Sequence, residues 1–150
     1  MKLRIGFGLA LVLATAAHAS ECDERTAKMA AERGMVLERK SPDGEWVHFT
    51  HPSAANLSML CRTKPGAKRA VHLRWDSASP PAQLFSLAAR AAEIAFNADP
   101  GDVRLLSMRC YQQALADADH EALLKHKGLE LDCTATPEGH GQVGITVWER

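Results

Sequence analysis

The sequence predicts an α+β fold: an antiparallel sheet of about six strands with helices packed on one face, forming a two-layer sandwich. Four segments in the first half alternate apolar and polar residues and are separated by connections of hairpin length. The apolar period then becomes helical, and it returns to a period of two near the end. The expected order is therefore a helix, four strands, two helices, a short third helical piece and two strands.

A helix is expected first, over residues 23–33, because good helix formers there end at Gly34, where a left-handed cap is favoured. Four strands follow, each with its apolar residues on one face and turn residues at its ends: 35–40, 45–51, 56–61 and 69–75. In the first of these strands, Met35 and Leu37 are expected to lie on one face.

Two longer helices are expected in the second half of the chain. The first begins at Ser79, with Ser as the cap and prolines in the first turn, and the second begins at Asp99 in the same way. A third helical piece is expected over residues 120–127, ending at Gly128. The last two strands are expected over the following apolar–polar alternations: 128–135 and 142–149.

The beginning of the chain has the pattern of a cleavable secretory signal peptide. Lys2 and Arg4 precede an uncharged stretch of about 13 residues, and Ala17-His18-Ala19 supplies small residues before the expected cleavage point. That stretch is shorter than the roughly 20 residues that a membrane-spanning helix needs, and no later segment comes close. We therefore expect residues 1–19 to be removed and residues 20–150 to form one globular domain, in the periplasm or secreted.

Charge excludes two classes of partner. With residues 1–19 removed, 16 basic residues face 18 acidic ones, a formal net charge of −2. A chain of this balance, with no basic run, lacks the electrostatic character of a protein that binds nucleic acid or an anionic membrane surface. No cofactor is expected, and the partner expected is another envelope or secreted protein.

Four cysteines remain in the expected mature chain: Cys22, Cys61, Cys110 and Cys133. No two of them form a Cys-x-x-Cys pair, which disfavours zinc-ribbon and thioredoxin-like sites. An even number of cysteines in an exported chain favours two disulfides, and three pairings are open. A core-facing Cys110 on a helix and an inward Cys133 on a strand favour that bridge, which leaves Cys22 with Cys61.

Two motifs resemble catalytic or cofactor signatures, and neither has the required context. Residues 139–144, Gly-His-Gly-Gln-Val-Gly, match the dinucleotide fingerprint by spacing, but a strand rather than a helix is expected to follow. This segment is interpreted as a flexible hairpin loop. His120-Glu121 begins like a zinc-protease helix, but Leu124 stands where the second histidine is needed. No catalytic residue is predicted, and an enzyme is the less favoured interpretation.

One candidate interaction patch emerges from the alternation of the strands. The residues expected to point away from the core combine tryptophan, histidine and arginine, which are side chains common in interfaces: Trp46, His48, His72, Arg74 and Trp148. The alternative is that the first helix lies across this face and buries the tryptophans. His48 and His72 are also weak candidates for a metal site, provided that their strands are neighbours.

These observations favour one function and leave two others open. The leading interpretation is an exported, disulfide-stapled, non-catalytic binding module, such as an inhibitor, an immunity-type antagonist or an accessory protein of the envelope. A periplasmic metal-binding protein using surface histidines is the alternative. The third is a small exported enzyme whose catalytic residues come from distant positions and leave no motif.

Overall fold

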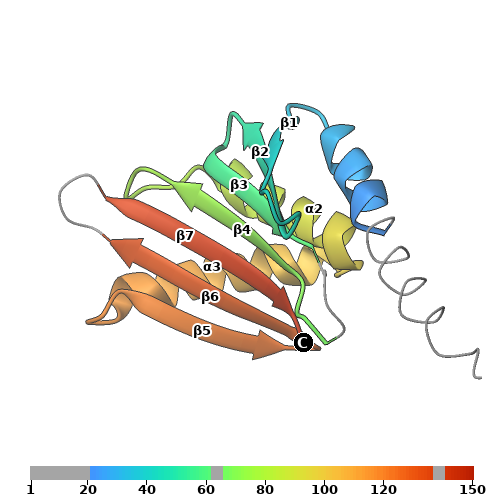
Figure 1. The fold of residues 1–150 in the computed structure, drawn as a ribbon. Helices are drawn as coiled ribbons and strands as arrows, with labels where there is room; N and C mark the ends of the chain where they lie inside the picture. The colour runs from blue at the N-terminus through green and yellow to red at the C-terminus, as the bar shows by residue number, and fades with distance from the viewer. Residues whose placement is uncertain (1–20, 62–65, 137–140) are drawn as a thin grey trace, which may run out of the picture.

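The protein is described by a computed structural model that covers residues 21–61, 66–136 and 141–150; the predicted signal peptide lies outside these residues. Within them, three helices pack on one face of an open antiparallel sheet of seven strands, in the order β1-β2-β3-β4-β7-β6-β5 (Figure 1). The predicted α+β class is confirmed, with seven strands rather than six. The last strand, β7, lies near the middle of the sheet and joins its two halves.

The first helix covers residues 21–30. The strands of the first half follow it directly: β1 (Val36–Lys40), β2 (Trp46–His51), β3 (Ala54–Leu60) and β4 (Ala70–Trp75). Two helices and three strands complete the chain: α2 (Ala82–Phe96), α3 (Pro100–Ala116), β5 (Glu121–His126), β6 (Leu129–Thr136) and β7 (Gln142–Glu149).

The two long helices differ in how they begin. The Asp99 side chain caps α3 by accepting a 2.7 Å hydrogen bond from the backbone N–H of Asp102, and Pro100 occupies the first turn. In contrast, α2 starts after Pro81 without a side-chain cap, so the predicted start at Ser79 is too early. It ends at Asn97, whose φ of 58° is left-handed.

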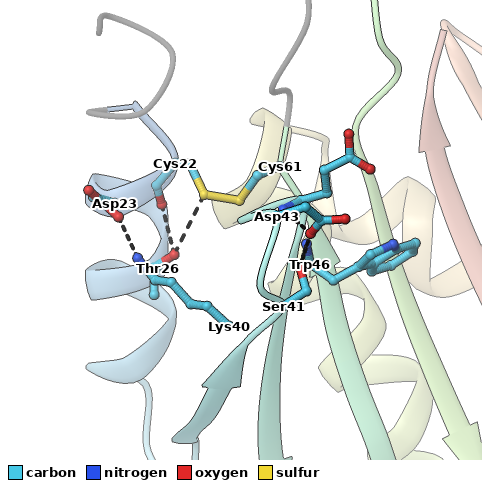
Figure 2. The surroundings of a disulfide bond; sticks show 9 residues. Cys22, Asp23, Thr26, Lys40, Ser41, Asp43, Trp46 and Cys61 are labelled. Carbon is cyan, nitrogen blue, oxygen red and sulfur yellow. Dashed lines mark hydrogen bonds and ion pairs between the residues drawn. A yellow bond between two sulfur atoms is a disulfide. The ribbon is translucent and has the colours of Figure 1, made fainter. Parts of the chain in front are cut away.

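The core lies between the helices and the sheet, and both disulfides border or enter it. Cys110–Cys133 joins α3 to β6 with both residues fully buried, and Cys22–Cys61 joins the first helix to the residue after β3 (Figure 2). The Cα atoms are 5.8 Å and 5.6 Å apart, respectively, within the usual range for disulfides. The favoured pairing is confirmed.

The first helix packs on the same side of the sheet as α2. Met29 is fully buried in the common core, and Glu32 forms a 2.5 Å ion pair with Arg90 of α2. At the other end of the helix, Asp23 pairs with Lys40 of β1 at 2.5 Å (Figure 2). The helix therefore lies beside α2 at the β1 end of the sheet, and it leaves the opposite face uncovered (Figure 1).

The predicted third helical piece over residues 120–127 is wrong, because this segment is strand β5, paired antiparallel with β6. Lys127 and Gly128 both have positive φ, 45° and 80°, which is the geometry of a two-residue hairpin turn. The short apolar run in β5 fits either a helical or a strand period, so its sequence did not discriminate. Pairing with β6 in a hairpin makes residues 121–126 a strand.

At the β1 edge of the sheet, the two apolar residues differ in burial. Met35 is buried, but Leu37 lies opposite Phe49 at the sheet edge and is 42% exposed. The pairing shifts between Leu37 and Arg39, so Glu38 is an extra residue in a β-bulge. Only Met35 therefore contributes to the core.

The third residue of the 139–144 motif, Gly141, has a packing role. A Cβ atom there would lie 2.5 Å from the backbone nitrogen of Ala78, whose carbonyl oxygen accepts a 2.8 Å hydrogen bond from the Tyr111 hydroxyl. Gly141→Ala is expected to lower the free energy of unfolding by about 1–3 kcal/mol, because the backbone must move to relieve the overlap. Urea unfolding measures this loss. Gly101→Ala, at an exposed helix position, is the control, and equal small effects would contradict the prediction.

Candidate functional site

The sheet face opposite the helices, here called the open face, carries three rows of side chains that run across the strands. The rows arise because paired antiparallel strands place directly opposed residues on the same side of the sheet. The aromatic row contains Trp46, Leu60, Ala70, Trp148 and Glu130. The histidine row contains His48, Ser58, His72, Thr146 and Asp132. The arginine row contains Asn56, Arg74, Gly144, Thr134 and Glu121.

The aromatic row has one tryptophan on each side of two apolar residues, Leu60 and Ala70. Trp46 on β2 and Trp148 on β7 are three strand spacings apart, about 14 Å. Both are half-buried, whereas Ala70 between them is fully buried although it belongs to the open face. Larger neighbours must therefore close over Ala70. The row forms an apolar strip with an indole toward each end.

The backbone holds Trp46 firmly at its end of the aromatic row. Its N–H donates to Ser41 Oγ at 2.8 Å, and its carbonyl oxygen accepts from the N–H of Ser41 at 2.8 Å. The Ser41 hydroxyl in turn donates to Asp43 at 2.5 Å, and the indole points away from the Cys22–Cys61 disulfide (Figure 2). These bonds fix the backbone from which the Trp46 indole projects.

The histidine row is polar and is buried at Ser58, while Asp132 at its other end is exposed. His72 Nδ1 and Thr146 Oγ1 are 2.9 Å apart in a hydrogen bond that joins β4 to β7. Burial lowers the pKa of His72 below its ordinary value, and the nearby positive charge of Arg74 lowers it further. His72 is therefore neutral at neutral pH. His48 Nδ1 is buried and has no hydrogen-bond partner in the described part of the chain.

His72 makes the stability of the protein sensitive to acid. Because its pKa is lower in the folded state, the unfolded chain binds the proton more readily, so stability falls as the pH drops below about 6.5. The fall ends below the folded-state pKa. His72→Gln, which retains a partner for Thr146, is expected to lose less stability than the wild type between about pH 7 and pH 5. Urea unfolding across this range measures the difference, and parallel pH profiles would contradict it.

The histidine row does not form the metal site that the sequence left open. His48 and His72 lie on β2 and β4, which are not neighbours, because β3 places Ser58 between them. The condition for a shared ion, that their strands be adjacent, is not met. Over residues 21–61, 66–136 and 141–150, no group of three or more His, Cys, Asp or Glu side chains is placed to hold a metal ion.

Ser58, a potential nucleophile, lies between His48 and His72, each a potential general base. Its hydroxyl, however, has Asn56 Oδ1 as its hydrogen-bond partner, at 3.4 Å, and the residue is only 4% exposed. Neither His48 nor His72 forms a hydrogen bond with Ser58 among those of the described residues. An activated serine needs both a hydrogen bond to its base and access to substrate. The row does not have this geometry.

The arginine row is the most exposed of the three. The Arg74 side chain is 44% exposed, and its Nε lies 3.0 Å from Asp76 Oδ1. Gly144 lies opposite Arg74 and has no side chain. A Cβ there would lie 2.6 Å from Thr134 Oγ1, so only glycine fits at this position. Arg74 is thus a partly exposed cation that is paired with Asp76 through Nε and lies opposite a position without a side chain. Gly144, the last glycine of the 139–144 motif, has a packing role; residues 139 and 140 lie outside the described residues.

A hollow of about 620 Å³ lies between the first helix and α2. Every charged side chain that lines it has an oppositely charged partner: Glu21, Glu24, Arg25, Lys28, Glu32, Arg69, Arg90 and Glu93. Such a groove offers no uncompensated charge to a ligand. Sequence reasoning missed it because it depends on which face of the sheet the first helix covers.

All five residues of the predicted patch lie on the open face, in neighbouring rows. Trp46 and Trp148 lie in the aromatic row, His48 and His72 in the histidine row, and Arg74 in the arginine row. Sequence reasoning missed Leu60 and Ala70, which complete the apolar strip between the tryptophans. Alternation along β3 is compatible with an outward Leu60, but only the observed register places this residue beside Trp46.

Comparison with known proteins gave no relative: no family model, no curated protein and no solved structure matches the chain. Among the described residues, no helix combines the length and the apolar character that crossing a membrane requires.

Proposed function

We propose that the protein is an exported, non-catalytic binding module that holds a protein partner on the open face of its sheet. The observation that carries this proposal is the apolar strip between Trp46 and Trp148, which no described helix covers. A sheet with one face packed on helices ordinarily presents a polar face to solvent. Half-buried tryptophans on either side of an apolar strip on the opposite face are instead typical of an interface.

The chemistry of the rows indicates what the partner presents. The strip between the two indoles suits an apolar side chain projecting from the partner, because tryptophan and arginine contribute most to binding when water is excluded around them. Arg74, two rows away, suits an acidic group at the rim. The neutral His72 and its neighbour Thr146 supply hydrogen bonds between these two contacts. A folded protein surface or a loop from another exported protein meets these requirements.

Export is supported by two independent features. The two disulfides fit an oxidising compartment, since such bonds are rare where thiols are kept reduced. The pattern of residues 1–19 supports passage to the periplasm or the medium by way of a signal peptide. The intact mass of the protein recovered from its own compartment tests this, since it should correspond to a chain that begins at Ser20.

Site-specific photo-crosslinking in the living host tests the binding proposal. A photoreactive amino acid replaces Trp148 on the open face in one variant and Leu105, which is 58% exposed on α3, in the control. Position 148 is expected to crosslink to one defined protein, and position 105 is not, because the two sites lie on opposite sides of the molecule. Identical products from both positions, or none from position 148, would refute the open face as the binding surface.

A further inference from the structure

The two edges of the sheet differ in how they are protected. At one edge, β1 contains a bulge at Glu38, and Lys40 is held by Asp23 of the first helix. At the other edge, β5 pairs with β6 in an unbroken register over all six residues and contains no proline. Its central residue, Leu123, is 55% exposed on the open-face side. Regular edge strands of this kind favour pairing with another strand, and proteins usually protect them with bulges, prolines or charges.

The backbone groups that β5 offers can be assigned from its pairing with β6. The N–H of Ala135 donates to the carbonyl oxygen of His120 at 2.9 Å. In an antiparallel pair the direction of these groups alternates, so Ala122, Leu124 and His126 also direct their N–H and C=O groups toward β6. Glu121, Leu123 and Lys125 therefore direct theirs away from the sheet, toward the unoccupied edge.

We propose that the protein forms a two-fold symmetric dimer in which β5 pairs antiparallel with β5 of a second copy. The symmetry axis passes beside Leu123, which lies opposite Leu123 of the second copy. Glu121 then lies opposite Lys125 of the second copy, and Lys125 opposite its Glu121. The seven strands of each copy join into one continuous sheet, with both sets of helices on the same side.

The faces and charges of Glu121, Leu123 and Lys125 favour this register over the neighbouring ones. Directly opposed residues must point to the same face, and Glu121, Leu123 and Lys125 all belong to the open face. With Leu123 at the centre, the edge-facing N–H and C=O groups of all three residues find partners. A shift by two residues places Leu123 opposite Lys125 and separates the opposite charges, and a shift by one brings opposed residues onto different faces.

The charges on β5 are available for this pairing. The Glu121 carboxylate forms no hydrogen bond or ion pair among those of the described residues, and Lys125 Nζ lies 3.8 Å from Glu130, a distant contact. Opposite charges directly across from one another stabilise paired strands, whereas like charges there destabilise them. Two identical Glu–Lys pairs around a central leucine make the edge self-complementary, as a two-fold interface requires. Because the pairing uses β5 and not the apolar strip, the inference is independent of the proposed partner.

Sedimentation velocity of the mature, oxidised protein over two decades of concentration tests the dimer. The wild type is expected to pass from monomer to dimer, and Glu121→Lys is expected to remain monomeric because it sets lysine opposite Lys125 twice. The double variant Glu121→Lys, Lys125→Glu restores opposite charges and is expected to dimerise again. Leu105→Lys, which charges an exposed leucine outside β5, is the matched control and is expected to dimerise like the wild type.

Three outcomes would overturn the proposal: a wild type that is monomeric throughout, a Glu121→Lys variant that still dimerises normally, or a double variant that fails to recover. Circular dichroism of each variant confirms that it is folded. Leu123→Pro provides a second test, because its missing N–H faces the edge and leaves the hydrogen bonds to β6 intact. It is expected to be a folded monomer, and a dimer of wild-type affinity would also contradict the proposed pairing.

Discussion

Replacing Cys110 and Cys133 together with alanine is expected to lower the free energy of unfolding by about 3 kcal/mol. The disulfide spans 23 residues, and its removal returns that segment's conformational freedom to the unfolded chain. It also removes the covalent link between α3 and β6 in the centre of the core, where both residues are fully buried. Urea unfolding of the oxidised proteins, monitored by tryptophan fluorescence, measures the loss.

The other disulfide serves as the comparison. Cys22–Cys61 attaches the first helix at the border of the core, and the double alanine variant there is expected to expose Met29 as the helix loosens. Reductant should then destabilise each double variant further, because each keeps one bridge. A Cys110→Ala, Cys133→Ala protein that unfolds at the wild-type urea concentration would show that the buried bridge adds nothing to stability.

The second large effect is expected on partner binding. Trp46→Ala combined with Arg74→Ala removes an indole from the aromatic row and the partly exposed cation two rows away. A tryptophan buried in an interface contributes about 2 kcal/mol or more, and an arginine at the rim contributes less, so the double variant is expected to weaken binding by at least one order of magnitude. Titration calorimetry with the partner identified by crosslinking at position 148 measures the change.

The control for this variant removes the same kinds of surface from the opposite side of the molecule. Leu105→Ala combined with Arg104→Ala truncates two exposed residues of α3 and is expected to bind the partner like the wild type. Both double variants should retain the wild-type circular dichroism spectrum. Undiminished binding by the Trp46→Ala, Arg74→Ala protein would show that the open face does not hold the partner.

Local patterns were sufficient for the parts of the fold with a strong period. The four strands of the first half and the two long helices lie where alternation and capping residues predict them, within a few residues. The patterns failed at β5, whose two adjacent leucines, Leu123 and Leu124, fit a buried helical turn as well as a strand. Pairing with β6 determined its structure, and no local propensity encodes that contact.

The candidate site was likewise predictable from local patterns only in part. Alternation along each strand identified which residues face away from the core, including both tryptophans. It did not reveal that β3 separates His48 from His72, or that β7 inserts between β4 and β6. Those facts depend on the order of strands in space. The face that the first helix covers was also undetermined, because its few apolar residues fit either side of a sheet equally well.

The position of β7 has a consequence for how the protein folds. β7 follows the other strands of the sheet in the sequence, yet it joins β4 to β6, and it pairs Trp148 with Ala70, about half of the chain away. Contacts so distant in sequence form slowly. A folding chain therefore keeps β4 and β6 as two unpaired edges until β7 pairs with both of them. Truncation before Gln142 is expected to yield an aggregating chain, because both edges then stay open.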